Sequence, residues 1–194
     1  MTPLESHHLF SIYSPLDTTI IALSSRYHVP LIGGTALEIL VRHHQLPVER
    51  PRSVNDIDFV CFRQPSADRA GFQRALLQLG LVVRDENPFS IHFATPEVEA
   101  DVLLSADDRY GQFYLKLGPY LLLDEVGQLL MKIDRFVSAN RANHVQDKID
   151  LLILLRLIGR AGRVEELEGF LEKWGYDELY INALNALIGE MPAD

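Results

Sequence analysis

Three aspartates have the residue type and spacing of a metal site. Asp56 and Asp58 lie two residues apart in the β-forming run DIDFVCF, and Asp101 opens the run DVLL. Side chains two apart on a strand point to one face, about 6.5–7 Å apart along the backbone. Carboxylates held so close repel each other unless a cation lies between them. Their hard oxygen atoms suit Mg²⁺ or Mn²⁺, and Asp101 would complete a site for two metal ions and for phosphate chemistry.

Glu99 is the alternative to Asp101, because it lies two residues earlier and on the same face of that strand. We favour Asp101, since the apolar residues that follow it predict a more buried position. His92, in the preceding run SIHFAT, is predicted to be a hydrogen-bonded sheet histidine rather than a catalytic base.

A second feature is the run of Gly33, Gly34 and Thr35, between a strand-like VPLI and a helix-like ALEILVRHH. Glycines before a helix let the backbone approach a ligand closely, and the exposed N–H groups and the helix dipole favour phosphate. The Thr35 hydroxyl would add a further hydrogen bond. The run therefore predicts a phosphate-binding turn.

The hydrophobic pattern predicts the elements that position these residues. We expect helices over 15–28, 35–44 and 66–80, a short strand before Gly33, a strand over 56–62, and antiparallel strands over 81–86, 89–95 and 98–104. We expect only helices from residue 121 onward, over 122–140, 144–160, 163–174 and 177–188. The predicted fold class is α+β, with a mixed part over residues 1–110 and a helical region over 111–194.

The composition excludes other classes of protein. With 47% hydrophobic and 23% charged residues among 194, the chain can bury a sizeable core, which argues against a disordered or coiled-coil protein. The net charge of −9 argues against a broadly basic protein that coats nucleic acid. Cys61 is the only cysteine, so neither an intrachain disulfide nor a cysteine zinc site can form. We see no signal peptide and no membrane span of ~20 apolar residues, and therefore expect a cytoplasmic protein.

The runs LIGGTALEIL, RSVNDIDFV and VEADVLL, in this order, resemble the nucleotidyltransferase superfamily with the DNA polymerase beta-like fold. The pattern of that superfamily is Gly-Gly or Gly-Ser after an apolar residue, then Asp-x-Asp, then a third acid on a later strand. The runs GGTAL and RSVNDID are most similar to the AbiEii-type nucleotidyltransferase toxins and their uncharacterised relatives. The resemblance implies a mixed sheet flanked by helices, with a C-terminal helical region that completes the cleft.

The resemblance continues into two helices, one with Lys132 and Arg135 and one with Asp147, Asp150 and Leu151. Lys132 and Arg135 share a helix face by their spacing, and together they can neutralise charge on a triphosphate. Asp147 and Asp150 also share a face, and would orient the basic pair or help to activate a hydroxyl. The alternative is an ion pair between the two helices without a chemical role.

The resemblance implies a metal-dependent enzyme that transfers NMP from an NTP to a hydroxyl of RNA, a protein or a small molecule. It also implies a toxin with an antitoxin partner. The implied catalytic residues are Asp56, Asp58, Asp101, Lys132 and Asp147, the first three as ligands of Mg²⁺ or Mn²⁺. The implied NTP contacts are Gly33, Gly34, Thr35, Lys132 and Arg135.

The alternative function is a catalytically inactive nucleotide-binding or protein-interaction module on the same fold. Two features suggest it: the 21 residues between Gly34 and Asp56, and the acidity of residues 161–194, which hold 8 Asp+Glu and 2 Lys+Arg. A metal-dependent phosphohydrolase is a third option.

Overall fold

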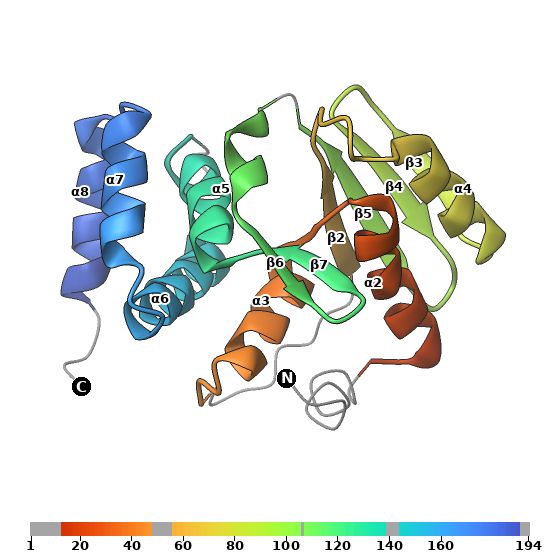
Figure 1. The fold of residues 1–194 in the computed structure, drawn as a ribbon, viewed down its shortest axis with the longest axis horizontal. Helices are drawn as coiled ribbons and strands as arrows, with labels where there is room; N and C mark the ends of the chain where they lie inside the picture. Colours follow the sequence, from red (N-terminus) through yellow and green to blue (C-terminus); the bar gives the residue numbers. More distant parts are fainter. Residues whose placement is uncertain (1–12, 48–55, 106, 139–143, 191–194) are drawn as a thin grey trace.

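The computed structural model of the chain describes residues 13–47, 56–105, 107–138 and 144–190 (Figure 1). Within these residues, seven strands form one mixed sheet in the order β3-β4-β5-β2-β1-β7-β6. The strands are β1 (Leu31–Ile32), β2 (Asp56–Cys61), β3 (Val82–Glu86), β4 (Ser90–Ala94), β5 (Glu99–Leu104), β6 (Tyr114–Leu117) and β7 (Tyr120–Leu123). The sheet, its flanking helices and the helical region that follows confirm the predicted α+β class.

The helices cover the sheet and continue beyond it. They are α2 (Pro15–Tyr27), α3 (Gly33–His43), α4 (Arg69–Gln78), α5 (Glu125–Ser138), α6 (His144–Arg160), α7 (Val164–Lys173) and α8 (Glu178–Gly189), with the 3₁₀ helix η1 (Asp108–Gln112) before β6. α2 and α4 contact each other. Phe72 of α4 meets Phe59 of β2 edge-on, with 4.8 Å between the ring centroids. Figure 1 shows α5 to α8 grouped beyond β6 and β7, on the side away from β3.

Local sequence signals explain several of these boundaries. α2 begins where the Ser14 hydroxyl accepts the Asp17 N–H and the Asp17 carboxylate accepts the Ser14 N–H in return, with Pro15 at the first helical position. β3 pairs antiparallel with β4, and β4 pairs antiparallel with β5, as predicted. α3 begins at Gly33, two residues before the predicted start, so both glycines belong to its first turn.

The hairpin of β6 and β7 is the main difference from the predicted fold. We expected a helix from residue 122, but Tyr120–Leu123 forms a strand that is buried along its whole length and pairs parallel with β1. The run YLLL shows no alternation of apolar and polar residues, because both faces of this strand are covered. Hydrophobic periodicity alone does not distinguish such a run from a buried helix. Helix α5 starts only at Glu125, and the division into domains at residue 110 stays a prediction.

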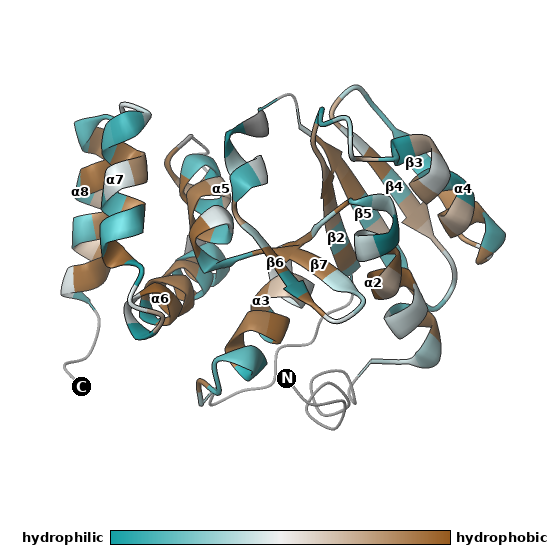
Figure 2. Cartoon of the chain, in the orientation of Figure 1, coloured by the Kyte–Doolittle hydropathy of each residue, from teal (hydrophilic) through white to brown (hydrophobic). Residues whose placement is uncertain are grey.

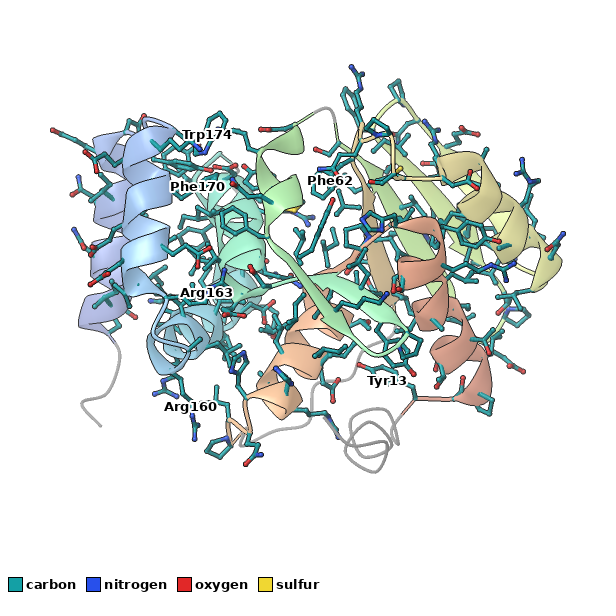
Figure 3. The ribbon with its side chains drawn as sticks, viewed as in Figure 1. Tyr13, Phe62, Arg160, Arg163, Phe170 and Trp174 are labelled. Carbon is teal, nitrogen blue, oxygen red and sulfur yellow. The ribbon has the colours of Figure 1, made fainter. Side chains whose placement is uncertain are left out.

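Two polar clusters hold α5 in place beside the sheet. At its start, the Arg163 guanidinium lies 2.8 Å from Asp124 Oδ2 and 2.9 Å from Glu125 Oε1. Farther along, the carboxylate of Asp134 accepts a hydrogen bond from the Tyr110 hydroxyl of η1. Figure 3 shows Arg163 on the side of α7 that faces α5. These contacts fix the helical region against the sheet, so side chains of α5 have defined positions relative to the strands.

A single apolar core runs from α2 through the sheet into α8. Figure 2 shows hydrophobic residues along β2 and along much of α6. Among the described residues, we find no helix with the length and apolar character needed to cross a membrane.

Candidate active site

The strand register brings the three predicted metal ligands together. β2 runs parallel to β5, and the pairing places Asp58 beside Asp101 and Asp56 beside Glu99. Asp56, Asp58 and Asp101 each offer a carboxylate oxygen, and these atoms all lie within 4.8 Å of one another. A cluster of anionic oxygen atoms at this spacing fits the donor set that Mg²⁺ and Mn²⁺ prefer.

The electrostatics of Asp58 also fit a bound cation. The pKa of Asp58 is raised to about 6, first by burial and then by the negative charges of Asp56 and Asp101. The positive charges of Lys132 and Arg135 lower the same pKa, so both lie close enough to act on the carboxylate. The raised pKa reflects mutual repulsion and lost hydration, which a divalent cation would offset.

Asp101 is more buried than Glu99, as we expected. Glu99 is exposed and lies outside the cluster, whereas Asp101 is partly buried, although 45% of its side chain remains accessible. His92 on β4 has its Nδ1 2.6 Å from Asp101 Oδ1, which confirms a hydrogen-bonded sheet histidine. The sequence did not show that its partner would be a residue of the candidate site, because only the pairing of β4 with β5 decides that.

The glycine turn lies directly against the aspartates. Gly33 has a φ of 67°, a left-handed conformation that side chains disfavour, and a Cβ there would overlap the Asp58 carboxylate. Its N–H donates to Gln128 Oε1 at 3.1 Å. This amide, which we expected to face a phosphate, is therefore already bonded to α5.

Thr35 also has a partner within the protein. Its side chain is fully buried, and its hydroxyl donates to the Asp56 carbonyl oxygen at 3.1 Å. The hydroxyl thus connects the start of α3 to the start of β2. Phosphate contacts by Gly34 and Thr35 stay predictions.

Lys132 lies between the two predicted aspartates of α6. Its Nζ is 2.8 Å from Asp150 Oδ2 and 3.6 Å from Asp147 Oδ1, and its side chain is 16% exposed. Gln146 Nε2 donates to Asp150 Oδ1 at 2.9 Å, so Asp150 is held from two sides. The ion pair between helices, which we considered as the alternative role, is therefore present in the structure. It does not exclude a second role, because the Lys132 charge still reaches Asp58.

Arg135 lies on α5, three residues after Lys132. It is exposed, and it makes no ion pair with any other residue that the structure describes. The residues from Arg52 to Asn55, which open the run RSVNDIDFV, fall outside the described residues.

Gln128 is the functional candidate that the sequence analysis missed. Its side chain is buried, it accepts from Gly33, and its Nε2 lies 3.4 Å from the Leu123 carbonyl oxygen. Gln128, Lys132 and Arg135 follow the i, i+4, i+7 spacing of one helix face. This spacing places Gln128 on the helix face of the two predicted cations, so it could have been predicted from the sequence as a site residue.

Three solved structures illustrate the likeness of this fold to known proteins. The antibiotic-resistance factor ANT(2'')-Ia is 15% identical with a TM-score of 0.54, over 88% of this chain and 95% of that one. A nucleotidyltransferase-like protein from Paracoccidioides brasiliensis is 15% identical with a TM-score of 0.50, over 92% and 94%. The Megavirus polyadenylate synthase is 14% identical with a TM-score of 0.52, over 80% of this chain and 32% of that one.

This chain has a nucleotidyltransferase-like fold. At the level of sequence, no family model and no curated protein matches it. At about 15% identity, the likeness to ANT(2'')-Ia shows the fold and leaves the chemistry to be argued from the residues of the site.

Proposed function

We propose that the protein is a metal-dependent nucleotidyltransferase that transfers NMP from an NTP to a hydroxyl group. The observation that carries the proposal is the convergence of Asp56, Asp58 and Asp101 from two parallel strands, with carboxylate oxygens within 4.8 Å of one another. The glycine turn on one side and two cations of α5 on the other are the groups that a triphosphate needs. The likeness in fold to proteins of this class supports the same proposal.

Each residue has a stated role in this proposal. The three aspartates hold the divalent cations, which neutralise phosphate charge and lower the pKa of the attacking hydroxyl. The acceptor oxygen forms a bond to the α-phosphorus, and the bond from that phosphorus to the oxygen bridging to the β-phosphate breaks. Pyrophosphate leaves with the electron pair, while Lys132 and Arg135 stabilise its charge. The hydroxyl proton passes to a nearby carboxylate or to water, and Asp147 orients Lys132.

The acceptor and the cellular role rest on the sequence resemblance. The runs GGTAL and RSVNDID support an AbiEii-type toxin that acts in the cytoplasm with an antitoxin partner. RNA, protein and small-molecule hydroxyls are the three acceptor classes of the proposal.

The test is label transfer from NTPs that carry the label on the α-phosphate. The protein is incubated with Mg²⁺ or Mn²⁺ and, separately, with total RNA, a protein extract and a mixture of polyhydroxyl metabolites. Label on an acceptor, with stoichiometric release of pyrophosphate, is the expected result. Release of free NMP without a labelled acceptor would instead support a phosphohydrolase.

A matched pair of variants ties that activity to the site. Asp101→Asn removes a charge from the cluster, whereas Glu99→Gln makes the same change two residues away on an exposed position of β5. Asp101→Asn should abolish transfer and Glu99→Gln should leave most of it. Equal loss in both variants, or greater loss with Glu99→Gln, would contradict the assigned ligand set.

A binding module without catalysis is the second candidate function. Three contacts favour it: the Gly33 N–H donates to Gln128, and Lys132 forms ion pairs with Asp147 and Asp150. Groups that already have partners have less to offer a triphosphate. In the same experiment, retention of NTP by the protein in Mg²⁺ without label transfer or pyrophosphate release would favour this candidate.

A further inference from the structure

A histidine outside the predicted catalytic set lies against the candidate metal site. His92 is on β4, and the antiparallel register pairs it directly with Asp101 on β5, which in turn pairs with Asp58 on β2. The three side chains therefore form a row on one face of three neighbouring strands. His92 is the end of the row away from the glycine turn.

The contact between His92 and Asp101 has a defined direction. His92 Nδ1 lies 2.6 Å from Asp101 Oδ1, a short distance for a hydrogen bond to a charged oxygen. An ionised carboxylate only accepts, so the hydrogen lies on Nδ1. This bond holds one oxygen of Asp101 and leaves the other for a cation.

Asp101 needs such a partner more than Asp58 does. Asp58 packs against Gly33 so closely that no Cβ fits between them, and packing alone restricts its side chain. Asp101 has 45% of its side chain accessible, and an exposed carboxylate samples several rotamers. The neighbouring His92 side chain is only 30% exposed, so most of its surface packs against other residues.

We propose that His92 is a positioning residue for the metal-binding carboxylate of Asp101, a role that rests on the proposed function. By holding Oδ1, His92 fixes the direction in which the free oxygen of Asp101 points toward Asp58. Hydrogen-bonded partners of metal ligands act in this way, and their loss weakens metal binding by about 10–100-fold.

The experiment measures binding of Mn²⁺ alone, by electron paramagnetic resonance of the unbound ion, in the absence of any reaction. His92→Phe keeps a ring of similar size without the donor, whereas His92→Asn offers an amide N–H near the position of Nδ1. We expect His92→Phe to weaken Mn²⁺ binding about tenfold. We expect His92→Asn to restore most of the affinity, with thermal stability similar in both variants.

Two controls separate positioning from a general structural effect. His28→Asn changes another partly buried histidine, at the left-handed end of α2, and should leave Mn²⁺ binding unchanged. In an Asp101→Asn background, His92→Phe should cause no further loss, because the anionic oxygen that His92 positions is absent.

The outcomes are distinct for the two proposals. Mn²⁺ binding that is equal in the unaltered protein and in His92→Phe overturns the positioning role and leaves the proposed function intact. Absence of Mn²⁺ binding to the unaltered protein overturns both. If His92→Phe does not fold, His92→Ala takes its place, and equal Mn²⁺ affinity in His92→Ala and His92→Asn overturns the positioning role.

Discussion

On the sheet side of the candidate site, three aspartates lie together with one imidazole; on the helical side, one lysine lies between two aspartates. The sheet side has surplus negative charge, which adds to burial in raising the pKa of Asp58 to about 6. On the helical side, Lys132 is already compensated by Asp147 and Asp150. The sheet side is therefore the part that a cation from outside would stabilise, whereas the helical side is stable without one.

This contrast changes what Lys132 can be expected to do. A lysine with no partner would serve the triphosphate alone, and its removal would leave the fold unaffected. Because Asp150 is 1% exposed and lies 2.8 Å from Nζ, Lys132 also compensates a buried charge. One residue thus contributes both to the fold and to the site.

The largest expected effect comes from the sheet side. Asp58→Asn should lower label transfer by roughly 10²–10³-fold, the order expected for loss of an electrostatic catalytic element. The same change removes the repelled charge, so the metal-free protein should unfold at a higher temperature than the unaltered one. Transfer assays and thermal unfolding on one preparation check both. Loss of stability together with activity in Asp58→Asn would contradict the conclusion that the sheet side carries uncompensated negative charge.

On the helical side, Lys132→Met should lower both activity and stability. It keeps the apolar stem but leaves Asp150 without its lysine, and we expect the free energy of unfolding to fall by about 3 kcal/mol. Arg135→Gln is the matched comparison, because Arg135 is exposed and should change stability by less than about 0.5 kcal/mol. Both variants should reduce transfer. Denaturant unfolding measures the difference, and equal stability of the two would contradict the role of Lys132 in the fold.

The double variant Lys132→Met with Asp150→Asn sharpens this result. Removal of both charges should recover much of the lost stability, since no buried charge then lacks its partner. Transfer should stay low, because the cation is still missing from the site. Recovery of transfer along with stability would show that Lys132 acts only through the fold.

The pH dependence of stability tests the sheet side without any reaction. The pKa of Asp58 rises from its usual 3.8 to about 6 in the folded protein, so between these values the native state holds a proton that the unfolded chain has released. The contribution of Asp58 to the free energy of unfolding is therefore largest below pH 3.8 and falls as pH rises to about 6. Its size is on the order of 3 kcal/mol.

Denaturant unfolding at a series of pH values, without divalent cations, measures that fall. It should be smaller in Asp58→Asn, and Mg²⁺ should reduce it in the unaltered protein by compensating the ionised carboxylates. An identical pH profile in the two proteins would show that Asp58 is not the group responsible.

The smallest expected effect concerns Gln128, which links the two sides. Gln128→Met keeps the length of the side chain but removes the acceptor for the Gly33 N–H, and should lower stability by about 1–2 kcal/mol. Transfer should fall as well, because the turn against Asp58 loses its fixed position. Gln112→Met removes an exposed side-chain hydrogen bond and should change neither quantity. Full activity in Gln128→Met would show that α5 does not position the turn.

The amino-acid sequence by itself determined the fold class, the three acidic positions and the glycine turn. Asp56 and Asp58 lie on one face because strand side chains alternate, and Gly33 begins a helix whose apolar residues recur with a helical period. These features are local, so neighbouring residues are enough to predict them.

Only the tertiary structure decided which of these residues have partners. The β6–β7 hairpin could not be recognised because β7 is covered on both faces and shows no alternation. The hydrogen bonds from His92 to Asp101 and from the Gly33 N–H to Gln128 join residues on different elements, and depend on strand register and on how α5 packs against the sheet. Compensation of Lys132 by Asp150 likewise depends on the packing of α5 against α6. Contacts between distant segments depend on how the whole core packs, and the hydrophobic periodicity of a single segment does not predict them.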